Sequence, residues 1–485
     1  MKKALITITL IAGTLTLSAQ NEIDALRYSQ QDVFGNARFA AMSGAFGALG
    51  GEFSSLSYNP AGIGMYQFSE FTLTPSLNYN STKSYYNESN FGYNKTGLSI
   101  SNLGLVFTLP KNNSEWKRIN IAIGWNQLAN YDQNIKIQGK NSTSSLVDNI
   151  LDYAQGNTID NLNAFHGAPA FWSDLIDLAN NSIDTTTDWY ANDNGNYISH
   201  ISSNTNKGQS KYIKSTGEEN EFVFSVGGSY NEQFYFGATI GFPTINYYEN
   251  STYNEHSFED TINGLHGFDY KEELSVYGSG INLKVGAIYR ATDQIKVGVS
   301  LHSPTLYSIE ETYNTLITTH FDYESYTETS PINYFEYELL TPWKAIVSAS
   351  TIFNTNIIIS ADYEIIDYTF SQMSSSDYAF ENENENIKNL YQRTENIRLG
   401  AEVNIKPFVL RSGYAKYGSA FANKDFSREN FSFGIGINNG GYFFDVAYVL
   451  SQGMDEHKLY SEDYVAPVDL VNTNHNLIFT LGFRY

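Results

Sequence analysis

The side chains that most often carry out catalysis are scattered along this sequence. Its histidines share no spacing typical of a catalytic or metal site: they are His166, His200, His256, His266, His302, His320, His457 and His475. Neither an HExxH nor a GxSxG motif occurs, so no zinc-protease helix or nucleophile elbow is indicated. The absence of cysteine excludes disulfides, thiolate metal sites and cysteine nucleophiles. We therefore expect no enzyme, no metal site and no cofactor.

Any site in this chain would have to be positioned by β-strands, because apolar and polar residues alternate along most of it. In the run NIRLGAEVNI, 396–405, every second residue is apolar, and the residues between are Asn, Arg, Gly, Glu and Asn. The last residues, 477–485, follow a similar pattern and end on Tyr485. A period of two is typical of strands with one apolar face and one small or polar face.

Two architectures contain strands of this kind. A soluble sandwich buries the apolar faces between its sheets, whereas a membrane barrel turns them towards lipid. Three observations favour the barrel: the second face repeatedly carries Gly, Asn, Arg and Glu, short turns alternate with long polar segments, and the chain ends on an aromatic residue in a strand. We therefore predict an all-β fold, a transmembrane antiparallel β-barrel of about 14 strands.

The N-terminus predicts export. MKK is followed by the apolar run ALITITLIAGTLTL and then by SAQ, which together have the three parts of a secretory signal peptide. We expect residues 1–19 to be removed after Ala19; an uncleaved anchor is the alternative, although the run is short for a spanning helix. No later run approaches the roughly 20 apolar residues of such a helix, so we expect a location in the outer membrane of a Gram-negative bacterium.

The predicted strands divide the mature chain into a short N-terminal part and a long barrel. Residues 20–66, called the hatch below, precede the first expected strand, and residues 67–485 are expected to form the barrel with long extracellular loops. The strands are expected near 68–82, 95–109, 117–131, 219–230, 233–249, 268–290, 293–313, 333–353, 355–370, 391–404, 407–417, 429–438, 441–452 and 474–485. Their even number places both ends of the barrel on the periplasmic side.

Three segments of the expected loops carry weaker signals. In 144–156 and in 170–181 the apolar residues approximate helical spacing. Such helices could cap the barrel, offer an apolar landing surface, or pack only on their own loop. The third segment, ENENENIKN at 381–389, is low in complexity and predicts a solvated loop tip.

The stretch that precedes the first strand departs from the alternating pattern. It is rich in Gly, Ala and Ser and ends in Asn59, Pro60, Ala61 and Gly62. Pro60 fixes its own φ and has no amide donor, which favours a rigid turn. With a strand directly after the turn, the segment 35–79 resembles the N-terminal region of the FadL/TodX family of outer-membrane transporters for hydrophobic compounds, in its Bacteroidetes-like version. Weaker similarities follow, in the runs YRATDQIKVGVSLHSP and TPWKAIVSAS.

The resemblance implies a channel for hydrophobic molecules, such as long-chain fatty acids or aromatic hydrocarbons. It implies that the hatch plugs the barrel, that an apolar pocket captures the ligand, and that the ligand leaves sideways through the wall into outer-membrane lipid. In this family the opening involves an inward kink of the third strand. Here the kink would fall within 119–131, where Gly124 is a candidate to break the strand pairing.

Three arginines are candidates for contact with a ligand carboxylate. Arg398, Arg411 and Arg484 face the lumen by strand parity, and a lumenal carboxylate such as Glu402 is the alternative partner for each. The chain has 52 acidic and 29 basic residues, a net charge of −23, which disfavours nucleic acid as a partner. We expect a monomer whose only protein partner is the barrel-assembly machinery.

Other functions fit the same sequence less well. A general porin leaves an aqueous channel and needs no plug. A haemin receptor would need histidine ligands, and no pair of histidines has a ligand-like spacing. An outer-membrane hydrolase would need a nucleophile and base constellation that the motifs do not show.

Overall fold

The computed structural model describes residues 22–111, 114–179, 195–201, 206–256, 258, 264–354 and 356–485. The expected signal peptide, residues 1–19, lies outside these ranges. Nineteen strand segments form one sheet, and the sheet closes into a barrel because its last strand pairs with its first. The segments are β1 (Glu70–Tyr86), β2 (Ser89–Pro110), β3 (Trp116–Asn130), β4 (Gln133–Asn141), β7 (Lys207–Tyr230), β8 (Phe234–His256), β9 (Leu265–Arg290), β10 (Ile295–His302), β11 (Leu306–Phe321), β12 (Ser325–Thr329), β13 (Asn333–Leu340), β14 (Lys344–Phe353), β15 (Ile357–Asp367), β16 (Gln372–Ser374), β17 (Arg393–Ile405), β18 (Phe408–Tyr417), β19 (Arg428–Asn438), β20 (Tyr442–His457) and β21 (Val468–Arg484).

The prediction of a closed antiparallel barrel of fourteen strands is confirmed. The number of segments is larger because β3 with β4, β10 with β11, and β13 with β14 each continue one strand of the wall, while β12 and β16 are short additions at its rim. Proline explains two of the interruptions. Pro304 lies between β10 and β11 and Pro342 between β13 and β14, where each lacks the amide donor that the ladder would use.

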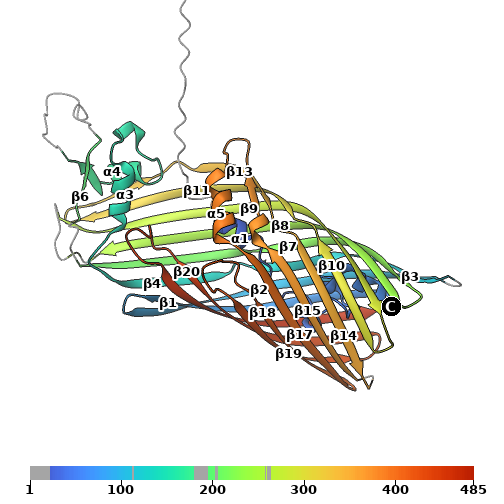
Figure 1. Ribbon diagram of the computed structural model, residues 1–485. Helices are drawn as coiled ribbons and strands as arrows, with labels where there is room; N and C mark the ends of the chain where they lie inside the picture. The colour runs from blue at the N-terminus through green and yellow to red at the C-terminus, as the bar shows by residue number, and fades with distance from the viewer. Residues whose placement is uncertain are drawn as a thin grey trace, which may run out of the picture.

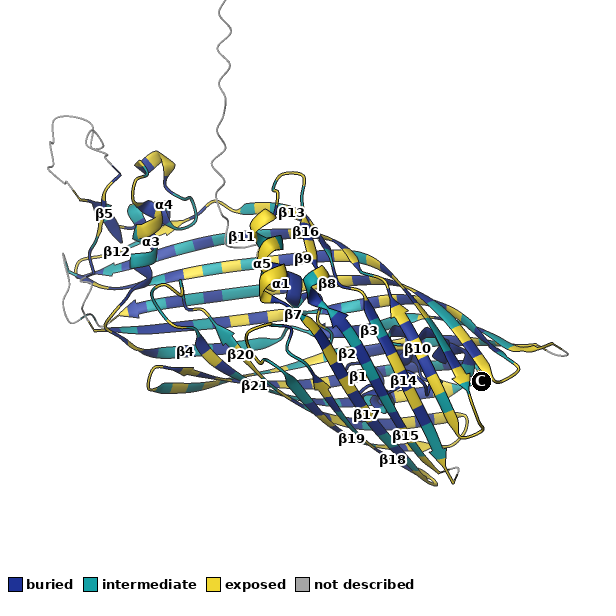
Figure 2. Cartoon of the chain, in the orientation of Figure 1, coloured by how far each residue is buried: buried dark blue, intermediate teal, exposed yellow. Residues whose placement is uncertain are grey.

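Buried and exposed residues alternate along the strands (Figure 2), and the exposed residues form an apolar band on the outside of the wall. On β10 the outward residues are Ile295, Val297, Val299 and Leu301, all exposed, and the residues between them point inward. Beyond Leu306 the outward residues of β11 become polar, beginning with Ser308. The band therefore has a defined height, as expected for a surface that faces lipid.

The two ends of the barrel differ. Short turns join the strands at the end where the C-terminus lies, and longer segments join most of them at the other end (Figure 1). The strands β7, β8 and β9 are 24, 23 and 26 residues long, more than the roughly 9–11 residues needed to cross a membrane. One side of the wall thus extends well past the apolar band at the long-loop end.

This extension corrects the prediction for the longest loop. We expected residues 132–218 to be a loop, but β4 and the first half of β7 pair there along nine residues. Their apolar residues, including Ile135, Ile137 and Ile213, point into an interior cluster. The outward positions are polar because this part of the wall stands above the lipid-facing band, so the strand signal is weaker than in the membrane.

The helices at the long-loop end also differ in part from expectation. The helix expected within 144–156 forms as α3 (Leu146–Ala154), begun by a capping box at Ser145. The second helix, α4 (Gly167–Trp172), ends early because Asp174 has a positive φ of 57°. The chain then forms β5 (Ile176–Leu178), which pairs with β6 (Tyr197–Ser199) in a separate small sheet.

The prediction of a solvated loop tip at 381–389 is wrong. These residues form α5 (Glu381–Leu390), and Ile387 is fully buried. Asn384 fixes the helix to the neighbouring strand: its side chain donates to Met373 O at 2.8 Å and accepts from Met373 N at 2.9 Å. The segment is low in complexity and mostly polar, so its one buried side chain, Ile387, did not indicate a helix.

The N-terminal residues lie inside the barrel. They form α1 (Glu22–Arg27), α2 (Ala37–Ala41) and two 3-10 helices, η1 (Phe53–Ser57) and η2 (Pro60–Met65); a third and fourth, η3 (Ile159–Asn161) and η4 (Tyr368–Phe370), lie in loops. We call residues 22–66 the hatch. Most of them are buried, and α1 packs beside α5 (Figure 1). Among the described residues, no helix is long and apolar enough to cross a membrane.

A charge on the outer band should destabilise the barrel. We expect Val299→Arg to lower the free energy of unfolding in lipid vesicles by about 2–4 kcal/mol, because the guanidinium would face the hydrocarbon near mid-band. Ser308→Arg is the matched control, since Ser308 points outward beyond the band, and should cost at most about 1 kcal/mol. Equal losses in denaturant unfolding would contradict the assignment of the lipid-facing band.

Candidate functional site

The turn Asn59-Pro60-Ala61-Gly62 fixes the lower part of the hatch. The Asn59 side chain caps η2 by accepting from Ala61 N at 3.1 Å, and its amide donates to Gly47 O at 2.6 Å. Pro60 occupies the first position of η2, where its missing N–H costs nothing. The four residues are therefore positional: they join two parts of the hatch before the chain enters β1.

Glycines on the lumenal face of the wall let the hatch approach the wall backbone. A Cβ added to Gly286 would overlap Asn59 Oδ1, one on Gly237 would overlap Pro60 O, and one on Gly298 would overlap Gly47 O. At six further wall glycines an added Cβ would also lie close to atoms of the hatch: Gly104, Gly124, Gly227, Gly400, Gly413 and Gly434. We call these nine residues the glycine belt. The belt spans strands around most of the barrel and fits the wall closely to the hatch.

A buried chain of ion pairs links the hatch to the wall. Arg38 in α2 donates two hydrogen bonds to Glu402 on β17, at 2.8 and 3.1 Å. Glu402 also accepts from Arg411 on β18 at 2.7 Å, and Arg411 donates to Asp445 on β20 at 2.5 Å. Removing Arg411 would leave the buried Asp445 without its ion partner, a loss that typically costs about 3–5 kcal/mol.

The remaining arginine candidates are also ion-paired. Arg398, which is 1% exposed, donates to Glu364 at 2.9 Å and lies over the ring of Tyr58. Arg484 donates to Glu70 at 2.8 Å. Contact between a ligand carboxylate and Arg398, Arg411 or Arg484 therefore stays a prediction, and any such ligand would have to compete with a carboxylate already in place.

The wall loses its hydrogen-bonded ladder between β2 and β3. Their pairing runs from Pro110 and Arg118 to Asn102 and Asn126 and ends there, so residues 89–101 of β2 pair only with β1. Past this point β3 bends: its register with β7 shifts at Leu128. Leu128 O accepts from Asp32 N of the hatch at 2.8 Å, so the bent part of β3 lies against the lumenal N-terminal segment.

Gly124 lies just before this bend. It is in regular register with Gly104 of β2 and Val223 of β7. A Cβ added to Gly124 would overlap the ring of Phe53 from η1. The register shift lies at 127–129, after Gly124. Gly124 thus belongs to the glycine belt by its contacts, and a role in opening the wall stays a prediction.

Two cavities lie in the lumen beside the hatch. The first is bordered by Asp32, Phe34, Asn130 at the end of β3, and Asn80 of β1, with further asparagines from β19 and from β21, the strand that pairs with β1. The second lies under α1, between Tyr28, Lys284, His302 and Lys344. Both are lined mainly by polar side chains, which differs from the apolar pocket that the resemblance implies.

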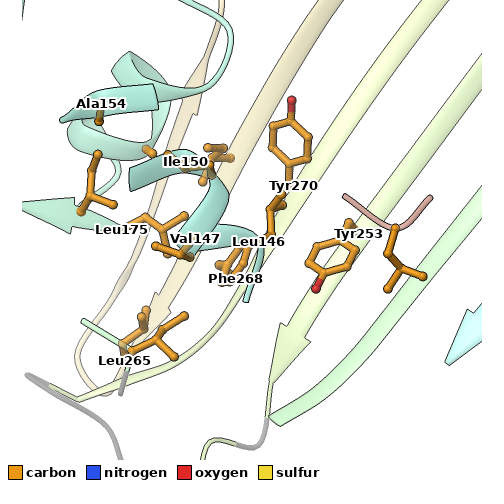
Figure 3. Close-up of a cluster of buried hydrophobic side chains, with 14 of the residues drawn as sticks. Leu146, Val147, Ile150, Ala154, Leu175, Tyr253, Leu265, Phe268 and Tyr270 are labelled. Atoms are coloured by element: carbon orange, nitrogen blue, oxygen red, sulfur yellow. The ribbon is translucent and has the colours of Figure 1, made fainter. Parts of the chain in front are cut away.

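The apolar part of the lumen is an interrupted stripe on one side of the wall, made of two separate clusters with the buried Glu311 and Thr315 between them. Its members point inward from three neighbouring strands and are buried: Ile245, Tyr247 and Tyr253 on β8; Val276, Tyr270, Phe268 and Leu265 on β9; Tyr307, Ile309, Ile317 and Phe321 on β11. We call it the inner apolar stripe. At the long-loop end it packs against Leu146, Val147 and Ile150 of α3 (Figure 3), and further down against α1. Helix α3 therefore caps the barrel as well as packing on its own loop.

The histidines are dispersed in space as they are in sequence. His302 contacts Tyr58 O of the hatch at 2.7 Å, His166 contacts the hydroxyl of Tyr270 at 2.7 Å, and His475 contacts that of Tyr448 at 2.7 Å. Within the described ranges, no group of three or more His, Asp or Glu side chains is placed to hold a metal ion.

The chain matches no protein-family model and no curated protein. Solved structures are similar over almost its whole length. A FadL homologue from Pseudomonas aeruginosa has a TM-score of 0.56 at 12% identity, covering 94% of this chain and 99% of that one. The Pseudomonas putida toluene transporter TodX has a TM-score of 0.53 at 10% identity, covering 94% and 99%. This chain has the FadL/TodX barrel fold.

Sequence reasoning located the hatch but missed most of what holds it. The glycine belt was visible only as small residues on the second face of strands, which a water-filled lumen would also explain. Arg38 and Asp362 were missed because each partner lies more than 300 residues away: Asp362 accepts from the backbone N–H groups of Phe46 and Gly47 at 3.1 and 3.0 Å. A signal for both existed, since inward charged residues in a barrel need partners.

The glycine belt can be tested at the Asn59 turn. We expect Gly286→Ala to shift the hatch, because the new methyl group would occupy the position of Asn59 Oδ1. Limited proteolysis of the purified protein, read by mass spectrometry, should then show new cleavages within residues 22–66. Gly453→Ala is the control, since the nearest atom to its added Cβ lies 3.5 Å away. Two variants with the wild-type cleavage pattern would contradict the close fit.

Proposed function

We propose that this protein is an outer-membrane channel for the uptake of hydrophobic small molecules, such as long-chain fatty acids or aromatic hydrocarbons, and not an enzyme. The observation that carries the proposal is the inner apolar stripe, whose two clusters pack against α3 at the rim and against α1 above the hatch. A porin lumen is polar and water-filled, whereas a stripe of this kind favours apolar solutes by about 0.8 kcal/mol per buried CH₂. The shared fold with the toluene transporter TodX supports the proposal.

The proposed route begins at the rim and follows the stripe into the lumen. Tyrosines along it, such as Tyr253, Tyr270 and Tyr307, pair an aromatic ring with a hydroxyl and suit molecules that leave water only partly. The hatch fills the lumen and blocks the direct route to the periplasm. It is held there by its close contact with the glycine belt and by the Arg38–Glu402–Arg411 chain. A ligand above the hatch therefore needs another exit.

The proposed exit is the gap in the ladder between β2 and β3. No ladder bond between these strands has to be broken above Asn102 and Asn126, and outward residues of β2 beside it, such as Leu98 and Ile100, are apolar and exposed. The first cavity lies next to Asn130 on the lumenal side. A ligand leaving here would pass directly into the lipid layer.

Uptake distinguishes the proposal from a general porin. We expect proteoliposomes containing the protein to take up a radiolabelled hydrocarbon or fatty acid, and to admit arabinose no faster than empty liposomes, because the hatch fills the lumen. Native mass spectrometry in mild detergent should also show a co-purified apolar molecule. Rapid arabinose entry with no uptake of apolar compounds would overturn the proposed function.

The lateral exit can be closed by a reducible bifunctional thiol cross-linker, since the chain has no cysteine of its own. Ser99 Oγ lies 3.0 Å from Gln127 Oε1, across the unpaired part of the β2–β3 boundary, so the linker replaces the length of the glutamine side chain. We expect the cross-linked Ser99→Cys, Gln127→Cys variant to lose most uptake and to regain it with reductant. A cross-link between Leu105→Cys and Ile123→Cys, which joins already paired positions, should leave uptake unchanged. Full uptake by both cross-linked variants would rule out this exit.

A further inference from the structure

Side chains, rather than a ladder, hold β4 against the hairpin formed by β1 and β2. One edge of β4 pairs with β7 along nine residues, whereas β4 and β2 share no ladder in the described part of the chain. Three backbone carbonyls, four residues apart, accept hydrogen bonds from side chains of the hairpin: Asp132 O from Asn80, Lys136 O from Ser84 at 2.5 Å, and Lys140 O from Asn87 at 2.7 Å. The end of β3 and all of β4 therefore rest on the hairpin through separate contacts.

Lys95 of β2 adds a charged contact to this arrangement. Its ammonium lies 3.0 Å from Asp132 Oδ1 and donates to Ser215 O on β7 at 2.6 Å. The side chains of Lys95 and Asp132 are 17% and 20% exposed, so water and salt screen the ion pair only in part. Lys95 thus connects β2 both to the end of β3 and to β7, in the region where β2 has lost its ladder with β3.

Gly97 of β2 provides the space for Asp132. A Cβ added to Gly97 would lie 2.5 Å from Asp132 Oδ2, so a side chain at this position would push the carboxylate away from β2. Gly97 lies in regular register with Asn78 of β1. What requires glycine here is the close approach of Asp132 rather than an unusual backbone conformation. The sequence of β2 therefore supplies both the space and the cation for this carboxylate.

The ion pair closes the upper end of the gap between β2 and β3. The lower end of the gap is the last ladder pair, Asn102 with Asn126. Between the two ends, Gln127 Oε1 accepts from Ser99 Oγ at 3.0 Å. From Lys95 to Asn102 an extended strand covers about 23 Å, which is long enough to admit an alkyl chain. Two strands that are fixed at both ends of such a gap can separate only by bowing apart.

We propose that Lys95 is the latch of the lateral exit: it holds Asp132, and with it the bent end of β3, against β2 until a ligand leaves. Separation of this ion pair turns a gap fixed at both ends into one hinged at Asn102 and Asn126. Lys95 is a positioning residue, because it acts on the strands and not on the ligand. This inference rests on the proposed uptake function and concerns the control of its exit.

Charge variants in proteoliposomes test the latch. We expect Lys95→Met to raise the initial rate of uptake of radiolabelled dodecane about fivefold, because loss of a partly buried ion pair favours the open form. The dodecane concentration at half the maximal rate should not change, since the latch lies outside the apolar stripe. The charge exchange Lys95→Asp, Asp132→Lys should bring the rate back towards that of the wild type. Lys83→Met is the matched control, because Lys83 is exposed on the outer face of the neighbouring β1, and it should leave the rate unchanged.

A tether at the latch gives the complementary test. The Lys95→Cys, Asp132→Cys variant, joined by a reducible bifunctional thiol linker, should lose most uptake and regain it with reductant. The Ser81→Cys, Asn94→Cys variant joins paired positions of β1 and β2 and should transport as the wild type does when it carries the same linker. Full uptake through the tethered latch, or an unchanged rate in Lys95→Met, would overturn the latch alone. Wild-type protein that takes up no apolar compound would overturn the proposed uptake function as well.

Discussion

The size of the barrel sets the problem that the rest of the structure solves. Side chains alone can fill an eight-stranded barrel, whereas sixteen strands leave an aqueous channel. A fourteen-stranded wall lies between these limits, so a sealed lumen needs additional polypeptide. Residues 22–66 supply it, and they can do so only where their backbone comes close to the wall. The glycine belt allows this approach, because its residues have no side chain that would overlap the hatch.

Close fit of two backbones leaves many polar groups buried, and their pairing decides where the hatch is fixed. At its base, Glu402 forms ion pairs with Arg38 and Arg411. Asp362 accepts hydrogen bonds from backbone N–H groups of the hatch. Above the hatch the pairing is incomplete. There the wall leaves one edge of β2 without a ladder partner. The firmly held base of the hatch and the unpaired edge of β2 thus lie at different heights along the barrel axis.

How much of this structure the sequence predicted depends on how far along the chain each sequence signal extends. Alternation within one strand is local, and it sufficed for the barrel and its strand number. The strands above the membrane were missed where both faces are partly polar, as along β4. The helix α5 was missed because only Ile387 and its neighbours reveal a buried side. Local signals cannot show that Arg38 meets Glu402, since 364 residues separate them.

The same distinction explains why the candidate site was predicted only in outline. Strand parity correctly turned Arg398, Arg411 and Arg484 inward, but parity says nothing about which inward cation lacks a partner. That depends on a count of donors and acceptors around a closed lumen, which requires all strands in register.

An exit through the hatch and an exit through the wall differ in what each must break. Moving the hatch separates Arg38 from Glu402 and the backbone N–H groups of Phe46 and Gly47 from Asp362, and it uncovers the glycine belt. Leaving between β2 and β3 above Asn102 breaks no ladder bond between those strands, where each such bond would contribute about 0.5–1.5 kcal/mol. An apolar ligand also stays out of water on the second route. These energies support the proposed lateral route.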